Sequence, residues 1–118
     1  MSPLLAAALE DAAVLAAERA WSTPDAAALA QAERLLQLVG PRWPVPEVRV
    51  EPDGAIVLAW EVDERGWVEL RVDGRGQLGH SAVIDGDDYS QAEDFAEPSA
   101  QLPDWATEVL RRLHARLQ

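Results

Sequence analysis

The sequence predicts one α+β domain in two layers: an N-terminal αα-hairpin, a four-stranded antiparallel meander and a C-terminal helix. Apolar residues recur at helical spacing near both ends, and between them the pattern alternates with period two, interrupted by glycine-ended turns. A length of 118 residues allows one hydrophobic core. The expected parts are a helical hairpin over 1–40, a sheet over 47–84, an acidic loop over 85–103 and a helix over 104–118.

The two N-terminal helices are predicted from their start and stop signals. Ser2-Pro3 supplies an N-cap followed by proline at the first helical position, ahead of an alanine-rich run to about residue 20. Thr23-Pro24-Asp25 repeats the signal, and helical spacing continues over about 25–39 until Gly40-Pro41 ends it. One or two residues would then separate the helices, which favours an αα-hairpin.

The middle of the chain is predicted to form a meander with strand order 1-2-3-4. Its three turns are each a three-residue loop ending in glycine, which adopts the left-handed conformation without steric cost. The loops are Pro52-Asp53-Gly54, Glu64-Arg65-Gly66 and Gly74-Arg75-Gly76. Closing them pairs Val50 with Ile56, Val62 with Val68, and Val72 with Leu78, which makes one face of the sheet almost wholly apolar.

The C-terminal segment is predicted to be an amphipathic helix. Trp105, Val109, Leu113 and Leu117 recur every fourth residue. Glu108 and Arg112 are spaced for an ion pair on the same helix. The apolar stripes of all three helices need a partner surface, and the apolar face of the sheet provides one.

Charge and composition exclude several classes of function. The net charge is −11, and six carboxylates without a single cation lie between residues 85 and 103: Asp85, Asp87, Asp88, Glu93, Asp94 and Glu97. This distribution argues against binding to nucleic acid, which needs a cationic face, and leaves a basic protein partner open. The absence of cysteine excludes disulfides, thiol nucleophiles and cysteine zinc motifs. The charged residues in the N-terminal run argue against a membrane span, so we expect a cytoplasmic protein.

Two apparent ligand motifs fail on context. Residues 74–79 match G-x-G-x-x-G, but a strand-like run follows where dinucleotide binding requires a helix, so we interpret the motif as a hairpin turn. The acids from Asp85 onward suggest a calcium loop, yet Ser90 and Ala96 stand where an EF-hand needs glycine and glutamate. We therefore expect neither a cofactor nor a metal site.

Residues of the outer sheet face and of the acidic segment form the candidate protein-binding surface. Tryptophan and arginine are favourable interface residues because each combines a large contact area with directional polar groups. The outer face is predicted to carry Arg49, Val57, Ala59, Glu61, Trp67, Glu69, Arg71 and Val83. The residues expected to contact a protein partner are Arg49, Trp67, Arg71, Asp85, Asp87, Asp88 and Tyr89.

The chain resembles, over 46–62 and 67–78, a pattern in small bacterial proteins of unknown function. The shared features are a Pro-led strand, a Pro-Asp-Gly turn and a strand ending in tryptophan, as in PEVRVEPDGAIVLAWEV here. The resemblance implies the meander and assigns no catalytic position. The acidic helix–sheet–helix composition is also similar to type III secretion chaperones, which place a helix inside the strand series.

Two functional hypotheses follow from the sequence. The first is a non-enzymatic module that binds a basic protein, acting as a chaperone or as an antidote to a toxin. The alternative is a small-ligand binder or hydrolytic enzyme with a pocket between helices and sheet near His80, which the register places on the core-facing side. A homodimer formed through the first strand, the fourth strand or the outer face is compatible with either hypothesis.

Overall fold

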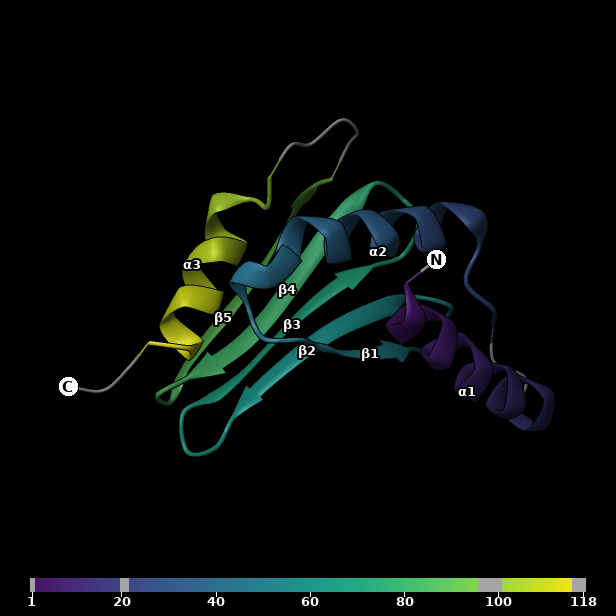
Figure 1. Ribbon diagram of the computed structural model, residues 1–118, viewed down its shortest axis with the longest axis horizontal. Helices are drawn as coiled ribbons and strands as arrows, with labels where there is room; N and C mark the ends of the chain where they lie inside the picture. The colour runs from purple at the N-terminus through teal and green to yellow at the C-terminus, as the bar shows by residue number, and fades with distance from the viewer. Residues whose placement is uncertain (1, 20–21, 96–100, 116–118) are drawn as a thin grey trace.

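A five-stranded antiparallel sheet forms the centre of the molecule (Figure 1). The structure, a computed structural model, describes residues 2–19, 22–95 and 101–115. The strands lie in the order β1-β2-β3-β4-β5, so the predicted α+β class and antiparallel meander are confirmed, while the predicted number of four strands is wrong. In chain order the elements are α1 (Pro3–Arg19), α2 (Ala26–Val39), the 3₁₀ turn η1 (Gly40–Arg42), β1 (Glu47–Val50), β2 (Ile56–Val62), β3 (Gly66–Val72), β4 (Gln77–Ile84), β5 (Asp87–Asp94) and α3 (Asp104–Leu113).

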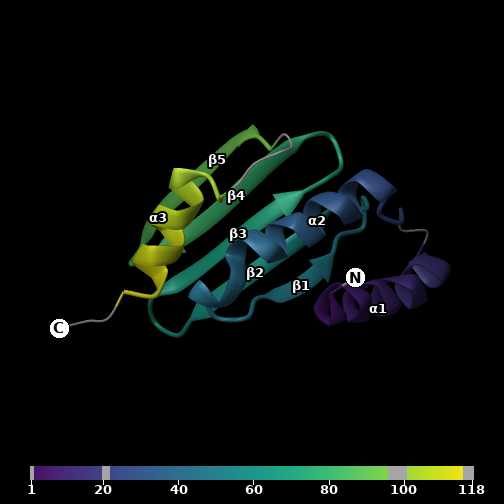
Figure 2. The same ribbon diagram turned by 45° about the horizontal axis from the view of Figure 1, so that its top comes forward.

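Helices α2 and α3 lie on one side of the sheet and form the second layer of the two that the sequence predicts, while α1 lies beside the β1 edge (Figures 1 and 2). Helix α2 packs on β2 and β3, α3 packs on β3 and β4, and α1 packs along β1 at the edge. The predicted αα-hairpin needs correction, because residues 20–25 separate the two helices and α1 uses its buried side on the edge strand. None of the helices within the described ranges has the length and apolar character that a bilayer crossing requires.

The core fills the space between the helices and the inner face of the sheet. Side chains at alternate positions of β2, β3 and β4 are fully buried there, among them Leu58, Leu70 and Leu78. Leu35 from α2 and Leu110 from α3 close the core from the helical side. Because burying each such leucine contributes about 1.5–3 kcal/mol, this layer is the main source of stability.

Two of the three predicted turns set the register as expected, and the second is wrong by two residues. Val50 pairs with Ile56 and Val72 with Leu78, but Val62 pairs with Gly66. In the second turn Glu64 takes the left-handed conformation, with φ 68°. Gly66 is required for another reason: a Cβ on it would lie 1.7 Å from the carbonyl oxygen of Val83. Because the error is an even number of residues, every side chain keeps its predicted face.

The predicted acidic loop over 85–103 contains the fifth strand. Asp85 and Gly86 have φ values of 52° and 87°, and Ile84 pairs with Asp87 across them. Two positive φ values in a two-residue loop are the geometry that Asp-Gly favours in tight hairpins. The turn directs the acidic segment back along β4, so the sheet extends to Asp94 and β4 is not an edge strand.

The candidate edge strand and the surfaces beside it

The predicted binding residues lie on two sides of the sheet. Cross-strand pairing and alternation put Arg49, Trp67, Arg71 and Asp88 on the outer face, which the helices leave bare. Asp87 and Tyr89 lie on the helix side of β5, and Asp85 lies in the turn before it. Strand β5 therefore contributes to both sides of the sheet. Asp88 lies in one cross-strand row with Val83 and Trp67 on the outer face, whereas Asp87 and Tyr89 lie on the helix side.

The arginines of the outer face are already paired within the chain. Arg49 forms an ion pair with Glu69, and the hydrogen bond to that carboxylate raises the pKa of the Arg49 guanidinium. Arg71 forms an ion pair with Asp53, whose carboxylate also accepts a hydrogen bond of 3.0 Å from the amide of Ala55. The Ala55 amide, and then Arg71, lower the pKa of Asp53. These cations are neutralised and do not offer an unpaired positive patch.

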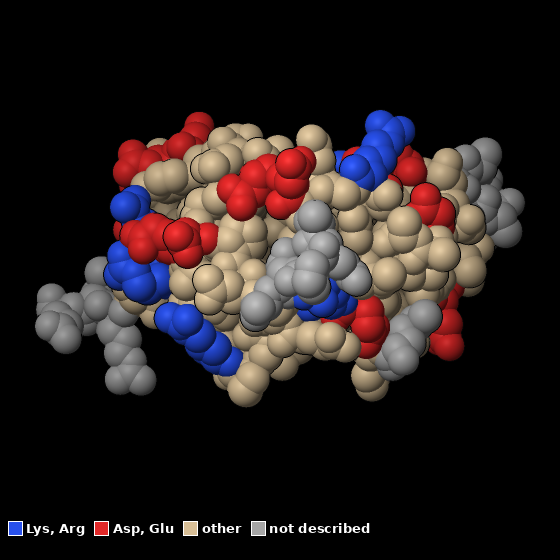
Figure 3. Space-filling model, turned by 90° about the horizontal axis from the view of Figure 1, so that it is seen from above, with Lys and Arg blue, Asp and Glu red and all other residues tan. Residues whose placement is uncertain are grey.

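The last strand, β5, presents an exposed edge with charge of one sign. Its eight residues read DDYSQAED, with four carboxylates and no cation, and all of them except Tyr89 are exposed. We call the four carboxylates the acidic edge: Asp87, Asp88, Glu93 and Asp94. Figure 3 shows acidic side chains in several groups across the surface, with the basic side chains mostly beside them.

The backbone of β5 has hydrogen-bonding groups that β4 does not use. The amide of Phe95 donates to the carbonyl of Gly76 at 2.7 Å, which fixes the phase of the ladder between these strands. Hydrogen-bonded and non-hydrogen-bonded pairs alternate in an antiparallel ladder. Ser90, opposite Ser81, therefore falls in a non-hydrogen-bonded pair, and its N–H and C=O point away from β4. Among the described residues, no strand pairs with this outer side of β5.

A hollow of about 350 Å³ lies between β5 and α3, and we call it the β5–α3 hollow. It is lined by His80, Asp88, Tyr89, Ser90, Gln91, Trp105, Glu108, Val109 and Arg112. The His80 ring is stacked on Trp105 with 4.0 Å between ring centres. Only 6% of His80 is exposed, and this burial lowers the pKa of the imidazole, so it is neutral near pH 7. The predicted core-facing position of His80 is confirmed.

Two nitrogens in the wall of the hollow have no hydrogen-bond partner. They are Nδ1 of His80 and Nε1 of Trp105, both of which are buried. Neither nitrogen has a partner within residues 2–19, 22–95 and 101–115. An unpaired buried donor or acceptor costs about 1–3 kcal/mol, so the contact between His80 and Trp105 carries this cost in the folded chain.

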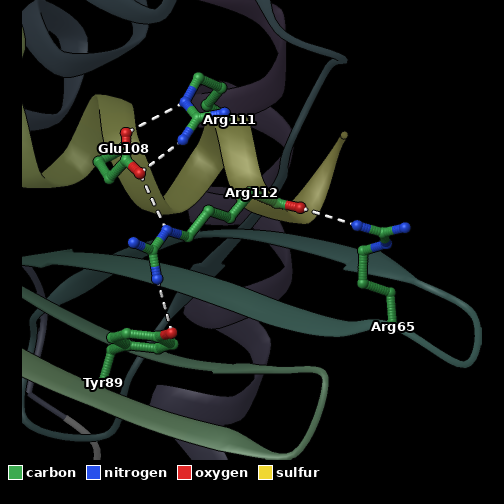
Figure 4. Close-up of polar contacts among 5 residues, drawn as sticks. All are labelled: Arg65, Tyr89, Glu108, Arg111 and Arg112. Carbon is green, nitrogen blue, oxygen red and sulfur yellow. Dashed lines mark hydrogen bonds and ion pairs between the residues drawn. The ribbon is translucent and has the colours of Figure 1, made fainter. Parts of the chain in front are cut away.

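A polar cluster ties α3 to β5 and to the turn between β2 and β3 (Figure 4). Glu108 accepts hydrogen bonds from Arg111 and Arg112, which hold the pKa of its carboxyl near 2. Arg112 also donates to the hydroxyl oxygen of Tyr89 at 2.8 Å, and Arg65 donates to the Arg112 carbonyl at 3.1 Å. The predicted ion pair of Glu108 with Arg112 is confirmed. The cluster leaves the carboxylate of Glu108 neutralised by two guanidinium groups.

The role of α3 in this region is not predicted from the sequence. Trp105 belongs to the apolar stripe of the helix, and no sequence pattern connects it to His80 or to the acidic segment. The available signal was Asp85-Gly86, a strong hairpin dipeptide, which would have returned the acidic segment alongside β4 and under the last helix. Within the parts of the chain described, no three His, Asp or Glu side chains gather as metal ligands do.

Comparison with known proteins gives no relative from which a function could be inferred. No protein-family model matches the chain, and no significant match is found among curated proteins or solved structures.

Proposed function

We propose that the protein is a non-enzymatic binding module that holds a basic segment of a partner protein along the acidic edge of β5. One observation carries the proposal: an eight-residue edge strand with four carboxylates and no cation is exposed to solvent. Opposite charge on a partner would steer its encounter with this edge and would fix its orientation there.

The surroundings of the acidic edge reinforce its charge. The whole chain carries a net charge of −11, so attraction to a basic partner begins before contact. Three arginines of the outer face and of α3, Arg49, Arg71 and Arg112, are paired with Glu69, Asp53 and Glu108. Binding is therefore expected to weaken steeply as ionic strength rises.

A second copy of this chain is a poorer occupant of the same edge. Pairing β5 with another β5 would place four carboxylates next to four more, and like charges in neighbouring strands are destabilising. A basic partner meets the same strand without this repulsion. The chaperone and antidote versions of the proposal both require this property, since each would cover a basic surface of another protein.

The alternative function, ligand binding or hydrolysis near His80, has the β5–α3 hollow in its favour. The imidazole is buried, however, and is stacked on Trp105, so little of the ring is accessible to a reacting group. Four consecutive residues of β5, from Asp88 to Gln91, line the hollow, which makes it suited to part of a longer bound chain.

The proposal is tested with fluorescein-labelled octapeptides, one rich in arginine and one rich in glutamate, titrated by fluorescence polarisation at low and high salt. The test variant combines Asp87→Asn, Asp88→Asn and Asp94→Asn; the control variant removes three exposed carboxylates elsewhere, by Glu10→Gln, Asp11→Asn and Asp63→Asn. Each surface pair contributes about 0.2–1 kcal/mol, so the test variant should bind the basic peptide roughly tenfold more weakly.

The control variant should retain most of the affinity, and the acidic peptide should not bind. Failure of the basic peptide to bind wild type at low salt would contradict the proposal. Equal losses in the two triple variants would contradict it as well, because they would assign the attraction to net charge and not to β5.

A further inference from the structure

We infer that the basic segment binds as a sixth strand on β5, with alternate apolar side chains entering the β5–α3 hollow. The inference rests on the proposed function and adds the binding mode and the sequence pattern of the partner. Three features of the structure lead to it: the unused backbone groups of β5, the position of the hollow and the distribution of the carboxylates over the two sides of the strand.

The unused backbone groups give the geometry of strand addition. Ser90 directs its N–H and C=O away from β4, and by the same alternation so do Asp88, Ala92 and Asp94. An extended chain about 4.8 Å further out would complete these hydrogen bonds. The eight residues of β5 are long enough for several such bonds.

The hollow lies beside the side chains that the added strand would direct to the helix side of the sheet. Tyr89 and Gln91 point their side chains to the helix side of β5, and both line the hollow together with Trp105 and Val109 of α3. Residues of a sixth strand on the same side would stand directly beside them. A volume of about 350 Å³ accommodates an aliphatic or aromatic side chain.

The charges around the hollow favour an uncharged side chain inside it. Glu108 is already bound by Arg111 and Arg112, and the guanidinium of Arg112 lies 5.6 Å from the centre of the Tyr89 ring. An additional cation in the hollow would meet Arg112, which lines it.

The other side of the added strand would face the outer carboxylates. Asp88 and Asp94 have their side chains on the outer face of β5, in the positions beside which basic residues of a sixth strand would lie. The partner segment is therefore an extended stretch of about eight residues, with arginine or lysine on the outer side and alternating apolar residues on the other side, at the positions beside Tyr89 and Gln91. An isolated basic patch without this alternation would satisfy the charge and leave the hollow empty.

The first experiment compares four peptides of equal charge by isothermal titration calorimetry with the full chain. The parent is an octapeptide that alternates arginine with valine or leucine, and an isomer of the same composition groups all arginines at one end. Two further versions of the parent carry backbone N-methyl groups on every second residue. One is methylated at the odd-numbered positions and the other at the even-numbered positions, so each blocks the N–H groups along one edge of the peptide. We expect the isomer and one methylated version to bind at least roughly tenfold more weakly than the parent, and the other methylated version to bind like the parent.

The second experiment blocks the edge on the protein. Ser90→Pro removes an N–H that β4 does not use and should keep the fold while abolishing binding of the parent peptide; Ser90→Ala should bind like wild type. If Ser90→Pro unfolds, the methylated peptides still test strand addition on the wild-type chain. Binding of all four peptides with equal affinity would overturn strand addition and leave the basic partner standing. No binding by any of them would overturn the proposed function too.

Discussion

The two edges of the sheet are protected in different ways. At one edge β1 has four residues, and α1 packs along it with Leu5, Ala8 and Ala12 buried. At the other edge β5 has eight residues and no described element on its outer side. An uncovered edge strand is a template for unwanted pairing, and proteins limit the risk either by covering the edge or by charging it.

The difference shows why the bare edge is the better candidate for recognition. A helix that covers an edge blocks every partner, whereas carboxylates repel only acidic chains. The charge of β5 thus disfavours pairing with a second copy and is compatible with pairing to a basic chain.

The largest effect is expected at Gly66, which lies at the start of β3 between β2 and β4. Gly66→Ala would place a Cβ 1.7 Å from a backbone oxygen, at a φ of 145°, and should lower the free energy of unfolding by at least about 4 kcal/mol. Gly76→Ala is the control: its φ is 80° but nothing lies within 4 Å, so about 1–2 kcal/mol is expected. Urea denaturation measures both. Equal losses would mean that the close approach to Val83 is wrong.

The covered edge is tested by Leu5→Ala. Leu5 lies on the buried side of α1 and is 1% exposed. Its truncation should lower the free energy of unfolding by about 2–3 kcal/mol, the lower part of the usual range, because a peripheral helix can move into the cavity. Leu4, at 38% exposed, gives the control variant Leu4→Ala, with a change within about 0.5 kcal/mol. Thermal unfolding of the two variants separates them. If they behave alike, α1 does not bury its inner side on β1.

On the charged edge, Tyr89→Phe removes the hydroxyl that accepts a hydrogen bond from Arg112. The expected cost is about 1 kcal/mol, typical of one hydrogen bond that involves a charged donor on a partly exposed site. Ser90→Ala on the same strand should change stability by less than about 0.5 kcal/mol. Chemical denaturation compares the two variants, and a neutral Tyr89→Phe would show that the contact does not hold α3 to β5.

The smallest effect at neutral pH is expected from His80, and it grows as the solution becomes more acidic. Burial lowers the pKa of His80 below its ordinary value of 6.5, so below that pH the unfolded chain takes up a proton that the folded chain does not. Stability should therefore be constant above about pH 7.5 and should fall between pH 7 and pH 5. Glu108 stays ionised throughout this window because its pKa is about 2. In His80→Asn the decline over that window should shrink; an unchanged decline would assign it to other groups.

Much of the architecture could be predicted because local signals and the alternation of apolar residues agree. The first and third turns set the predicted registers. At the second turn the register differs by two residues because Glu64 takes the left-handed conformation that the sequence predicts for Gly66, and this even difference leaves the faces intact. The resemblance to the small bacterial proteins stays a prediction.

The candidate site was predicted less well, for a physical reason. Strand β5 has no apolar alternation to identify it, since it lies at the edge and depends on its turn and on pairing with β4. The contact of Trp105 with His80 joins residues distant in sequence, and no local pattern encodes it. The predicted residues Arg49 and Arg71 were found on the expected face, but paired with acids of their own chain.

Amide hydrogen exchange, followed by NMR with and without the alternating arginine octapeptide, tests the central claim most directly. The amides of Ser90 and Ala92 point away from β4 and should exchange rapidly in the free protein. Saturation with the peptide should slow their exchange at least roughly tenfold and leave β1 unchanged. Unchanged exchange along β5, or new protection confined to β1, would contradict the account.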